Sequence, residues 1–225
     1  GKEPIVNKAI EEQICLGTIT STTIMANADG FEGAVAITKK YSQISYGIHL
    51  ILDEYRPILD CNVFRETGIV DANGNFVVNA IFKAEITNEL LDAVENEWDA
   101  QLCKLEQNGI YPTHIDSHHH VHTIPALQPI LIRLMRKHNI LKVRNCDYIN
   151  KERALHGYKH FYGNNRLKEI AYLIVRMPRF IRSCRWTNTM RETAKMADIF
   201  CSTKSYFNNK EYFTKYATDK VVELE

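Results

Sequence analysis

The stretch Ile110-Tyr-Pro-Thr-His-Ile-Asp-Ser-His-His-His-Val-His122 contains five of the chain's nine histidines and one carboxylate, Asp116. Its first six residues are β-prone and apolar enough for a short buried strand. After the histidines, Pro125 opens a segment to His138 in which apolar residues recur at helical spacing. The stretch therefore predicts a strand, a polar cluster and a helix in that order. Active sites of α/β proteins gather at such strand ends.

Segments typical of helices and of strands alternate along the rest of the chain. We expect helices at 5–16, 31–41, 88–107, 126–138, 165–182 and 210–218, and strands at 18–25, 45–52, 112–117, 142–144, 198–202 and 221–224. Asn88 is a suitable N-cap for the helix at 88–107, and Gly109 is a suitable terminator. The alternation predicts an α/β fold with a parallel sheet, open or closed into a barrel.

The length of 225 residues and the apolar content of 45% suit one α/β domain with a large core. We therefore expect a single domain of catalytic type over residues 1–225. Residues 53–81 carry Pro57, Gly68 and Asn73-Gly74 and show no clear periodicity. A stretch of this length without its own secondary structure predicts a long functional loop or lid.

The charge and cysteine patterns exclude several classes of protein. The net charge of +1 gives no general attraction to nucleic acid or to an anionic membrane, and no apolar run approaches 18 residues. No strand is followed by a glycine-rich phosphate loop, which disfavours nucleotide binding. The six cysteines form no Cys-x-x-Cys pair, so zinc fingers and a disulfide framework are disfavoured. Reduced thiols in a cytoplasmic protein fit this pattern best.

The histidines make a metal centre the first functional hypothesis, because imidazole is the commonest metal ligand in proteins. A lone histidine in an apolar strand, such as His49, is more often a core residue than a ligand. Two parallel strands, however, could bring His49 and His118 to the same rim, within reach of one ion at about 2.0–2.1 Å. Asp116 would then orient a ligating imidazole through its other nitrogen. The alternatives are a solvated histidine loop, or a helical pairing of His118 with His122.

Several strings resemble the YdjC-like carbohydrate deacetylases, a family whose best-known member is chitooligosaccharide deacetylase. The matching strings are 113–125 (Thr-His-Ile-Asp-Ser-His-His-His-Val-His-Thr-Ile-Pro), 45–50 (Ser-Tyr-Gly-Ile-His-Leu), 17–27 and 6–10. Their order and spacing agree with the family over residues 1 to about 145, and the remainder aligns only loosely. The resemblance implies a distorted or incomplete (β/α) barrel with parallel strands, of the polysaccharide-deacetylase type.

The same resemblance implies an activity and a cofactor. The family hydrolyses the N-acetyl group of an acetylated (oligo)saccharide with one divalent metal ion, Mg²⁺ or Zn²⁺. Its two histidine ligands fall on His49 and His118. Its aspartate ligand belongs to an Asp-Asp-Phe-Gly string that would precede Gly1, and its general-acid histidine belongs to a Cys-His-Pro string that would follow Glu225. We therefore expect a chain truncated at both ends; the alternative is a naturally shorter, inactive relative.

Other polar residues are candidates for holding the substrate. Asn27 lies just past a predicted strand, although ordinary turn and strand polarity explains this position equally well. Arg144 lies at the end of another predicted strand and is a weaker candidate, and His120 lies in the histidine cluster. Exposed apolar surface around the loop at 53–81 would favour a homodimer. A non-catalytic sugar- or metal-binding relative is the main alternative function. A phosphoesterase is a weaker one, because a two-metal site usually needs more carboxylates.

Overall fold

The computed structural model describes residues 2–144 and, beyond them, 167, 170–171, 174, 181, 185–190, 195–196, 199–201 and 222–224. The chain divides into two compact units, residues 1–142 and 143–225. The expectation of one domain over 1–225 stays a prediction.

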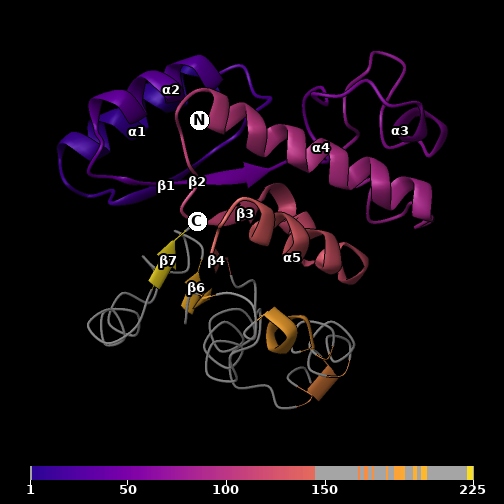
Figure 1. Ribbon diagram of the computed structural model, residues 1–225. Helices are drawn as coiled ribbons and strands as arrows, with labels where there is room; N and C mark the ends of the chain where they lie inside the picture. The colour runs from indigo at the N-terminus through magenta and orange to yellow at the C-terminus, as the bar shows by residue number, and fades with distance from the viewer. Residues whose placement is uncertain are drawn as a thin grey trace. The chain divides into compact units, whose positions relative to one another are not determined.

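The first unit is built on three parallel strands. In the order of the sheet, β2 (Ser45–Leu50) lies between β1 (Ser21–Ile24) and β3 (Ile115–Ser117), as Figure 1 shows. Both pairings are parallel, and the second sets His49 opposite Asp116 and Leu50 opposite Ser117. The expected α/β class with parallel strands is confirmed, and within the described residues the sheet is open. β4 (Lys142–Val143) follows β3 in the strand order, at the boundary of the two units.

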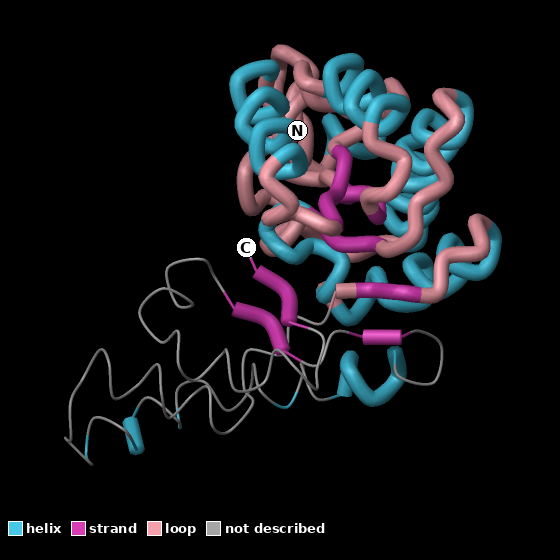
Figure 2. The backbone as a smooth tube through the Cα atoms, turned by 90° about the vertical axis from the view of Figure 1, so that its left-hand side faces the viewer, coloured by secondary structure: helices cyan, strands magenta, loops and turns pink. Residues whose placement is uncertain are grey.

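Helices and loops surround these strands, as the tube in Figure 2 shows. The helices expected at 5–16, 31–41, 88–107 and 126–138 are confirmed. They are α1 (Pro4–Cys15), α2 (Phe31–Lys40), α4 (Asn88–Gln107) and α5 (Gln128–Lys137). None of the helices in the described part of the chain is long and apolar enough to cross a membrane.

The longest helix, α4, shows why these segments fold as they do. Its buried apolar residues recur at spacings of three or four and form one face toward the core: Leu90, Val94, Trp98, Leu102 and Leu105. Its N-cap is Thr87 rather than Asn88, because the Thr87 hydroxyl accepts a hydrogen bond from the Leu90 backbone N–H at 3.2 Å. Gly109 follows the helix with a φ of 77°, as expected of a terminator.

Two strands begin later than the sequence predicts. The backbone N–H of Thr18 donates to Gln13 at the end of α1, so residues 18–20 close that helix before β1 begins. β3 begins only at Ile115. Within 53–81 the structure adds one short helix, α3 (Asn62–Glu66), that the sequence did not reveal. Two 3₁₀ segments, η1 (His118–Thr123) and η2 (Pro125–Leu127), join β3 to α5.

The second unit contains short strands. β6 (Ile199–Cys201) pairs in parallel with β7 (Val222–Leu224), which confirms the strands expected at 198–202 and 221–224. β5 (Lys195–Met196) was not expected, and residues 185–190 are helical. The helix predicted at 210–218 lies outside the described residues, and so does most of the one predicted at 165–182.

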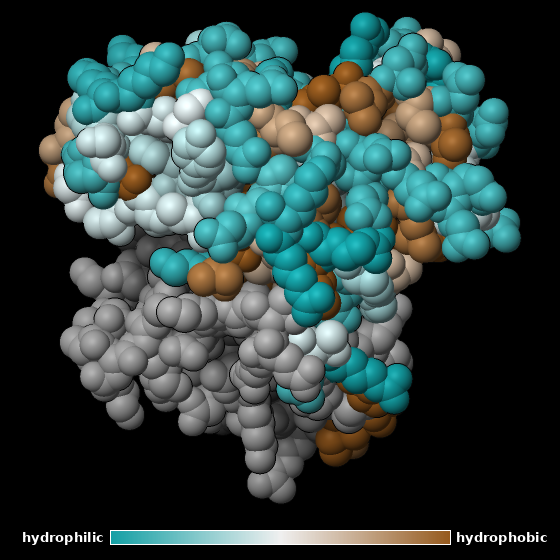
Figure 3. All heavy atoms as spheres, viewed as in Figure 1, coloured by the Kyte–Doolittle hydropathy of each residue, from teal (hydrophilic) through white to brown (hydrophobic). Residues whose placement is uncertain are grey.

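Apolar side chains are exposed on the segment that follows β2. They are Leu59, Val77, Val78, Phe82 and Ile86. Figure 3 shows hydrophobic residues gathered in places between the polar ones on the face of the first unit that it presents. Such surface is the basis for expecting a homodimer, which stays a prediction.

The close approach of β2 to β3 requires glycine at position 47. A Cβ there would lie 2.6 Å from the backbone oxygen of His114 and 2.6 Å from its ring Nε2. Gly47→Ala should therefore lower the free energy of unfolding by about 1–3 kcal/mol, the usual cost of overpacking, in urea denaturation. Gly68→Asn is the control, because its Cβ would meet nothing within 4 Å and asparagine tolerates the φ of 69°. Equal midpoints for Gly47→Ala and the parent would contradict this account.

Candidate metal centre

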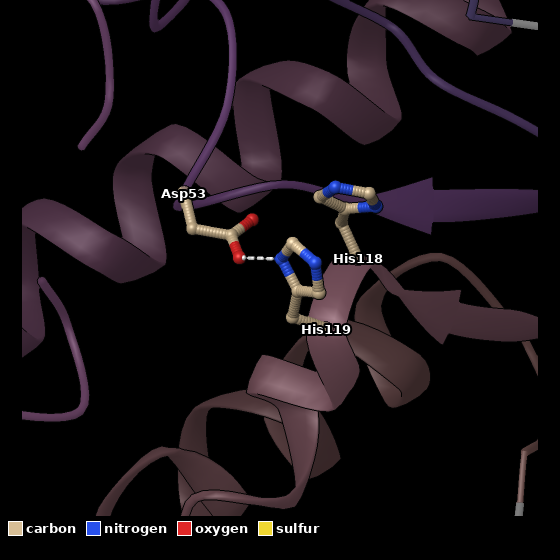
Figure 4. A group of neighbouring side chains, drawn as sticks. All are labelled: Asp53, His118 and His119. Atoms are coloured by element: carbon tan, nitrogen blue, oxygen red, sulfur yellow. Dashed lines mark hydrogen bonds and ion pairs between the residues drawn. The ribbon is translucent and has the colours of Figure 1, made fainter. Parts of the chain in front are cut away.

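The side chains of the candidate site come from the carboxyl ends of β2 and β3. His49 lies near the end of β2, and Asp53 and Glu54 follow that strand after Ile51 and Leu52. Asp116 lies in β3, and His118 and His119 begin η1. Because the two strands are parallel neighbours, their carboxyl ends meet at one edge of the sheet. Figure 4 shows Asp53, His118 and His119 turned toward one another at this edge.

Asp116 fixes the ring of His49. Its Oδ1 lies 2.7 Å from His49 Nδ1, and the Thr23 hydroxyl donates to its Oδ2 at 3.3 Å. Asp116 is 5% exposed, so this carboxylate is held within the protein. A carboxylate on Nδ1 selects the tautomer with the proton there and leaves a lone pair on Nε2. His49 can therefore offer Nε2 to a cation.

His118 lies against that free nitrogen. Its Nδ1 is 3.5 Å from His49 Nε2, with 5.6 Å between the ring centroids. Its Nε2 is 2.9 Å from Glu54 Oε2. Burial lowers the pKa of His118 below its ordinary value, as do neighbouring His119 and His49, while Asp53 and Glu54 oppose the shift. Because its pKa is lowered, the His118 imidazole stays neutral at a lower pH than the imidazole of an ordinary histidine. The neutral form is the one that binds metal.

Asp53 is a buried carboxylate that the sequence analysis missed. It is 0% exposed, and its Oδ2 lies 2.5 Å from His119 Nδ1. Its Oδ1 meets no hydrogen-bond donor among the residues that the structure describes. Asp53, His118 and His119 each offer one ligand atom, and these atoms lie within 4.8 Å of one another. The available signal was an acidic pair directly after a buried strand, four and five residues beyond His49.

A left-handed turn aims the histidines that follow β3. His119 and His120 have φ values of 46° and 59°, which residues other than glycine adopt uncommonly. The hydroxyl of Ser117 accepts a hydrogen bond from the backbone N–H of His122 at 3.0 Å and contacts its ring Nδ1. His122 is therefore buried against Ser117. η1 is not a regular helix, so the alternative that places His118 and His122 on one helical face does not hold.

Two buried polar residues of α4 hold the segment that carries Asp53 and Glu54. The Gln101 side chain bonds both the N–H and the C=O of Ile51, at 3.0 and 2.9 Å. The Glu97 carboxylate accepts hydrogen bonds from the N–H groups of Ile58 and Leu59, each at 2.9 Å. A hydrogen bond from Gln101 to Glu97 joins the two side chains. Burial raises the pKa of Glu97, although these hydrogen bonds oppose the shift.

The predicted substrate-binding residues lie in different surroundings. Asn27 donates to the backbone oxygen of Arg56 at 2.9 Å, so it helps to hold the segment after β2. His120 is partly exposed beside His119, and its backbone oxygen accepts from the Thr123 hydroxyl. Arg144 is buried and belongs to the second unit. Contact of any of the three with a substrate stays a prediction.

Comparison with known proteins gives the family. Residues 1–223 match the family described as YdjC-like protein. A carbohydrate deacetylase of Clostridium beijerinckii is 35% identical over 153 residues, which cover 68% of this chain and 59% of that protein. A chitooligosaccharide deacetylase of Salmonella paratyphi B is 26% identical over 175 residues, which cover 74% of this chain and 67% of that one. The chain thus spans little more than half the length of the first of these relatives.

A solved structure agrees with the fold. It is a putative cellobiose-phosphate cleavage protein of Enterococcus faecalis, with a TM-score of 0.69 and 22% identity, covering 98% of this chain and 74% of that one. At this identity the likeness shows the fold alone, which is consistent with the polysaccharide-deacetylase type expected from the sequence. The chain belongs to the YdjC-like family, as its histidine string indicates.

Replacing Glu97 tests how the segment after β2 is held. In Glu97→Gln one carboxylate oxygen becomes an NH₂ group, which faces backbone donors, so a buried hydrogen bond is lost. We expect the free energy of unfolding to fall by about 1–3 kcal/mol in urea denaturation. Glu95→Gln on the same helix breaks an ion pair with exposed Arg133 and should cost only about 0–1 kcal/mol. A larger loss for Glu95→Gln than for Glu97→Gln would refute this role.

Proposed function

We propose that this protein is a metal-dependent carbohydrate N-deacetylase, which removes the N-acetyl group of an acetylated saccharide through attack of water on the amide carbonyl. The observation that carries the proposal is the approach of His49 Nε2 to His118 Nδ1, at 3.5 Å, with Asp116 bonded to the opposite nitrogen of His49. Two imidazoles in this arrangement are suited to hold one cation. The names of the deacetylase relatives support the reaction and the substrate class.

The donor set fits a divalent cation, either Zn²⁺ as it stands or Mg²⁺ with added water ligands. His49 and His118 would hold it. Asp53 offers a buried carboxylate with a ligand atom within 4.8 Å of one of His118, and its Oδ1 meets no hydrogen-bond donor in the described part of the chain. When bound, such an ion polarises the amide carbonyl and lowers the pKa of its water. Asp116 orients the His49 ring, so that its Nε2 faces Nδ1 of His118.

The Asp53–His119 pair is suited to accept the proton of the attacking water. Asp53 Oδ2 would accept a hydrogen bond from Nδ1–H of His119, and Nε2 of the neutral ring would then act as the base. The ring of His119 is 46% exposed, so a substrate and water could reach it, whereas Asp53 is shielded. The pair therefore resembles the carboxylate–imidazole arrangement by which many hydrolases orient a general base.

The reaction is tested by acetate release from a panel of N-acetylated saccharides, using the full-length protein with added Zn²⁺ or Mg²⁺. His49→Ala and His118→Ala should each reduce metal binding, measured by calorimetry, and bring acetate release to the level without metal. His114→Gln is the control, because this histidine lies outside the group. Metal binding without any acetate release would indicate a non-catalytic relative, and tight metal binding by both alanine variants would refute the site.

Asp116→Asn separates orientation of His49 from ligation. The amide keeps the shape of the carboxylate but loses its charge, so we expect the metal affinity to fall by about 10–100-fold, the usual effect of losing such an orienting partner. Calorimetric titration with Zn²⁺ measures this. Asp60→Asn alters an exposed carboxylate paired with Arg65 and should leave the affinity unchanged. An unchanged affinity in Asp116→Asn would show that the carboxylate does not act through His49.

A further inference from the structure

A second group of metal-binding side chains lies where α4 packs against the end of α5, on residues that the proposed reaction does not use. Asp99 and Cys103 are four residues apart on α4, and therefore share one face of that helix. His138 is the C-cap residue of α5. One ligand atom from each of the three lies within 4.8 Å of the others.

His138 is oriented by a carboxylate on each nitrogen. Its Nδ1 lies 2.7 Å from Glu106 Oε1, and its Nε2 lies 2.9 Å from Asp99 Oδ1. The side chain is 4% exposed, so the ring is fixed by packing as well. A carboxylate on one nitrogen with the other directed at further ligands is the usual arrangement around a metal-bound histidine. Glu106 thus takes the orienting position, and Nε2 faces Asp99.

The charges around Asp99 favour an ionised carboxylate. Burial raises the pKa of Asp99, but hydrogen bonds from Lys137 and His138 outweigh it and bring that pKa below its ordinary value. Lys137 Nζ lies 2.7 Å from both oxygens of Asp99. The thiol of Cys103 points at Asp99 Oδ2, at 3.9 Å. Burial, and then the charge of Asp99, raise the pKa of this thiol, so a cation must displace its proton.

We propose that Asp99, Cys103 and His138 form a second metal site for a transition metal of the zinc class, with Glu106 holding the His138 ring. A set of one sulfur, one nitrogen and one oxygen donor suits Zn²⁺ and Co²⁺, whereas Mg²⁺ and Ca²⁺ prefer oxygen alone. On binding, the thiol proton of Cys103 and the Nε2 proton of His138 leave to solvent. The partly exposed cluster leaves room for water as a fourth ligand.

The test is titration of the full-length, metal-stripped protein with Co²⁺, followed by absorption spectroscopy. A thiolate bound to Co²⁺ gives a charge-transfer band in the near ultraviolet, which a site of histidine and carboxylate ligands does not give. We expect the band to reach its maximum when one Co²⁺ is bound at Cys103 in each protein chain. The band should be absent in Cys103→Ser, and it should disappear when Zn²⁺ displaces Co²⁺. Cys61→Ser is the matched control and should keep the band.

Two further variants separate this site from its surroundings. Glu106→Gln should weaken Co²⁺ binding by about 10–100-fold while keeping the band, because Glu106 acts through the ring of His138. The double variant His49→Ala, His118→Ala should keep the band at full strength, which makes this result independent of the proposed catalytic centre. Absence of the band in the parent protein, or its survival in Cys103→Ser, would overturn the proposal and leave the group as an ion-pair cluster between two helices.

Discussion

The pairing of β2 with β3 is the constraint on which the candidate site depends. Their parallel register sets Ile48 opposite Ile115 and, one step along, His49 opposite Asp116. A shift of one residue would turn each side chain of β2 to the other face of the sheet and separate the two groups. The absence of a side chain at Gly47 lets the strands approach at this point. The register of the two strands therefore places His49 beside Asp116, and the hydrogen bond between them then orients the His49 ring.

Helix α4 holds the segment after β2 through polar contacts, in addition to the apolar face that it turns to the core. Its residues Glu97 and Gln101 are fully buried, and their hydrogen bonds go mainly to backbone groups of residues 51 and 58–59. Buried backbone donors and acceptors need partners, and these groups of the segment find them in side chains of α4. One helix thus satisfies both ends of the segment that bears Asp53 and Glu54. A neighbouring face of the same helix carries Asp99 and Cys103 toward α5.

Local sequence patterns predicted most of the helices and strands that the structure describes, but only some of the contacts between them. The apolar spacing of α4 defined its length, but threonine and asparagine are both good caps, so the sequence did not decide between Thr87 and Asn88. His49 and His118 could be grouped because parallel strands end at a common edge, aided by the family resemblance. Asp53 was missed because its position is set by Glu97 and Gln101, which lie 38 to 50 residues away from the backbone groups they bind. No local pattern encodes such contacts.

The left-handed turn at His119 and His120 has a consequence for which residues these two positions tolerate. Each non-glycine residue held in such a conformation costs roughly 1–3 kcal/mol, and the surroundings must enforce it. Glycine would adopt this conformation with less backbone strain, but it would remove the imidazole groups, among them the His119 ring that contacts Asp53. The two histidines therefore carry a backbone cost that the contacts around the turn must offset.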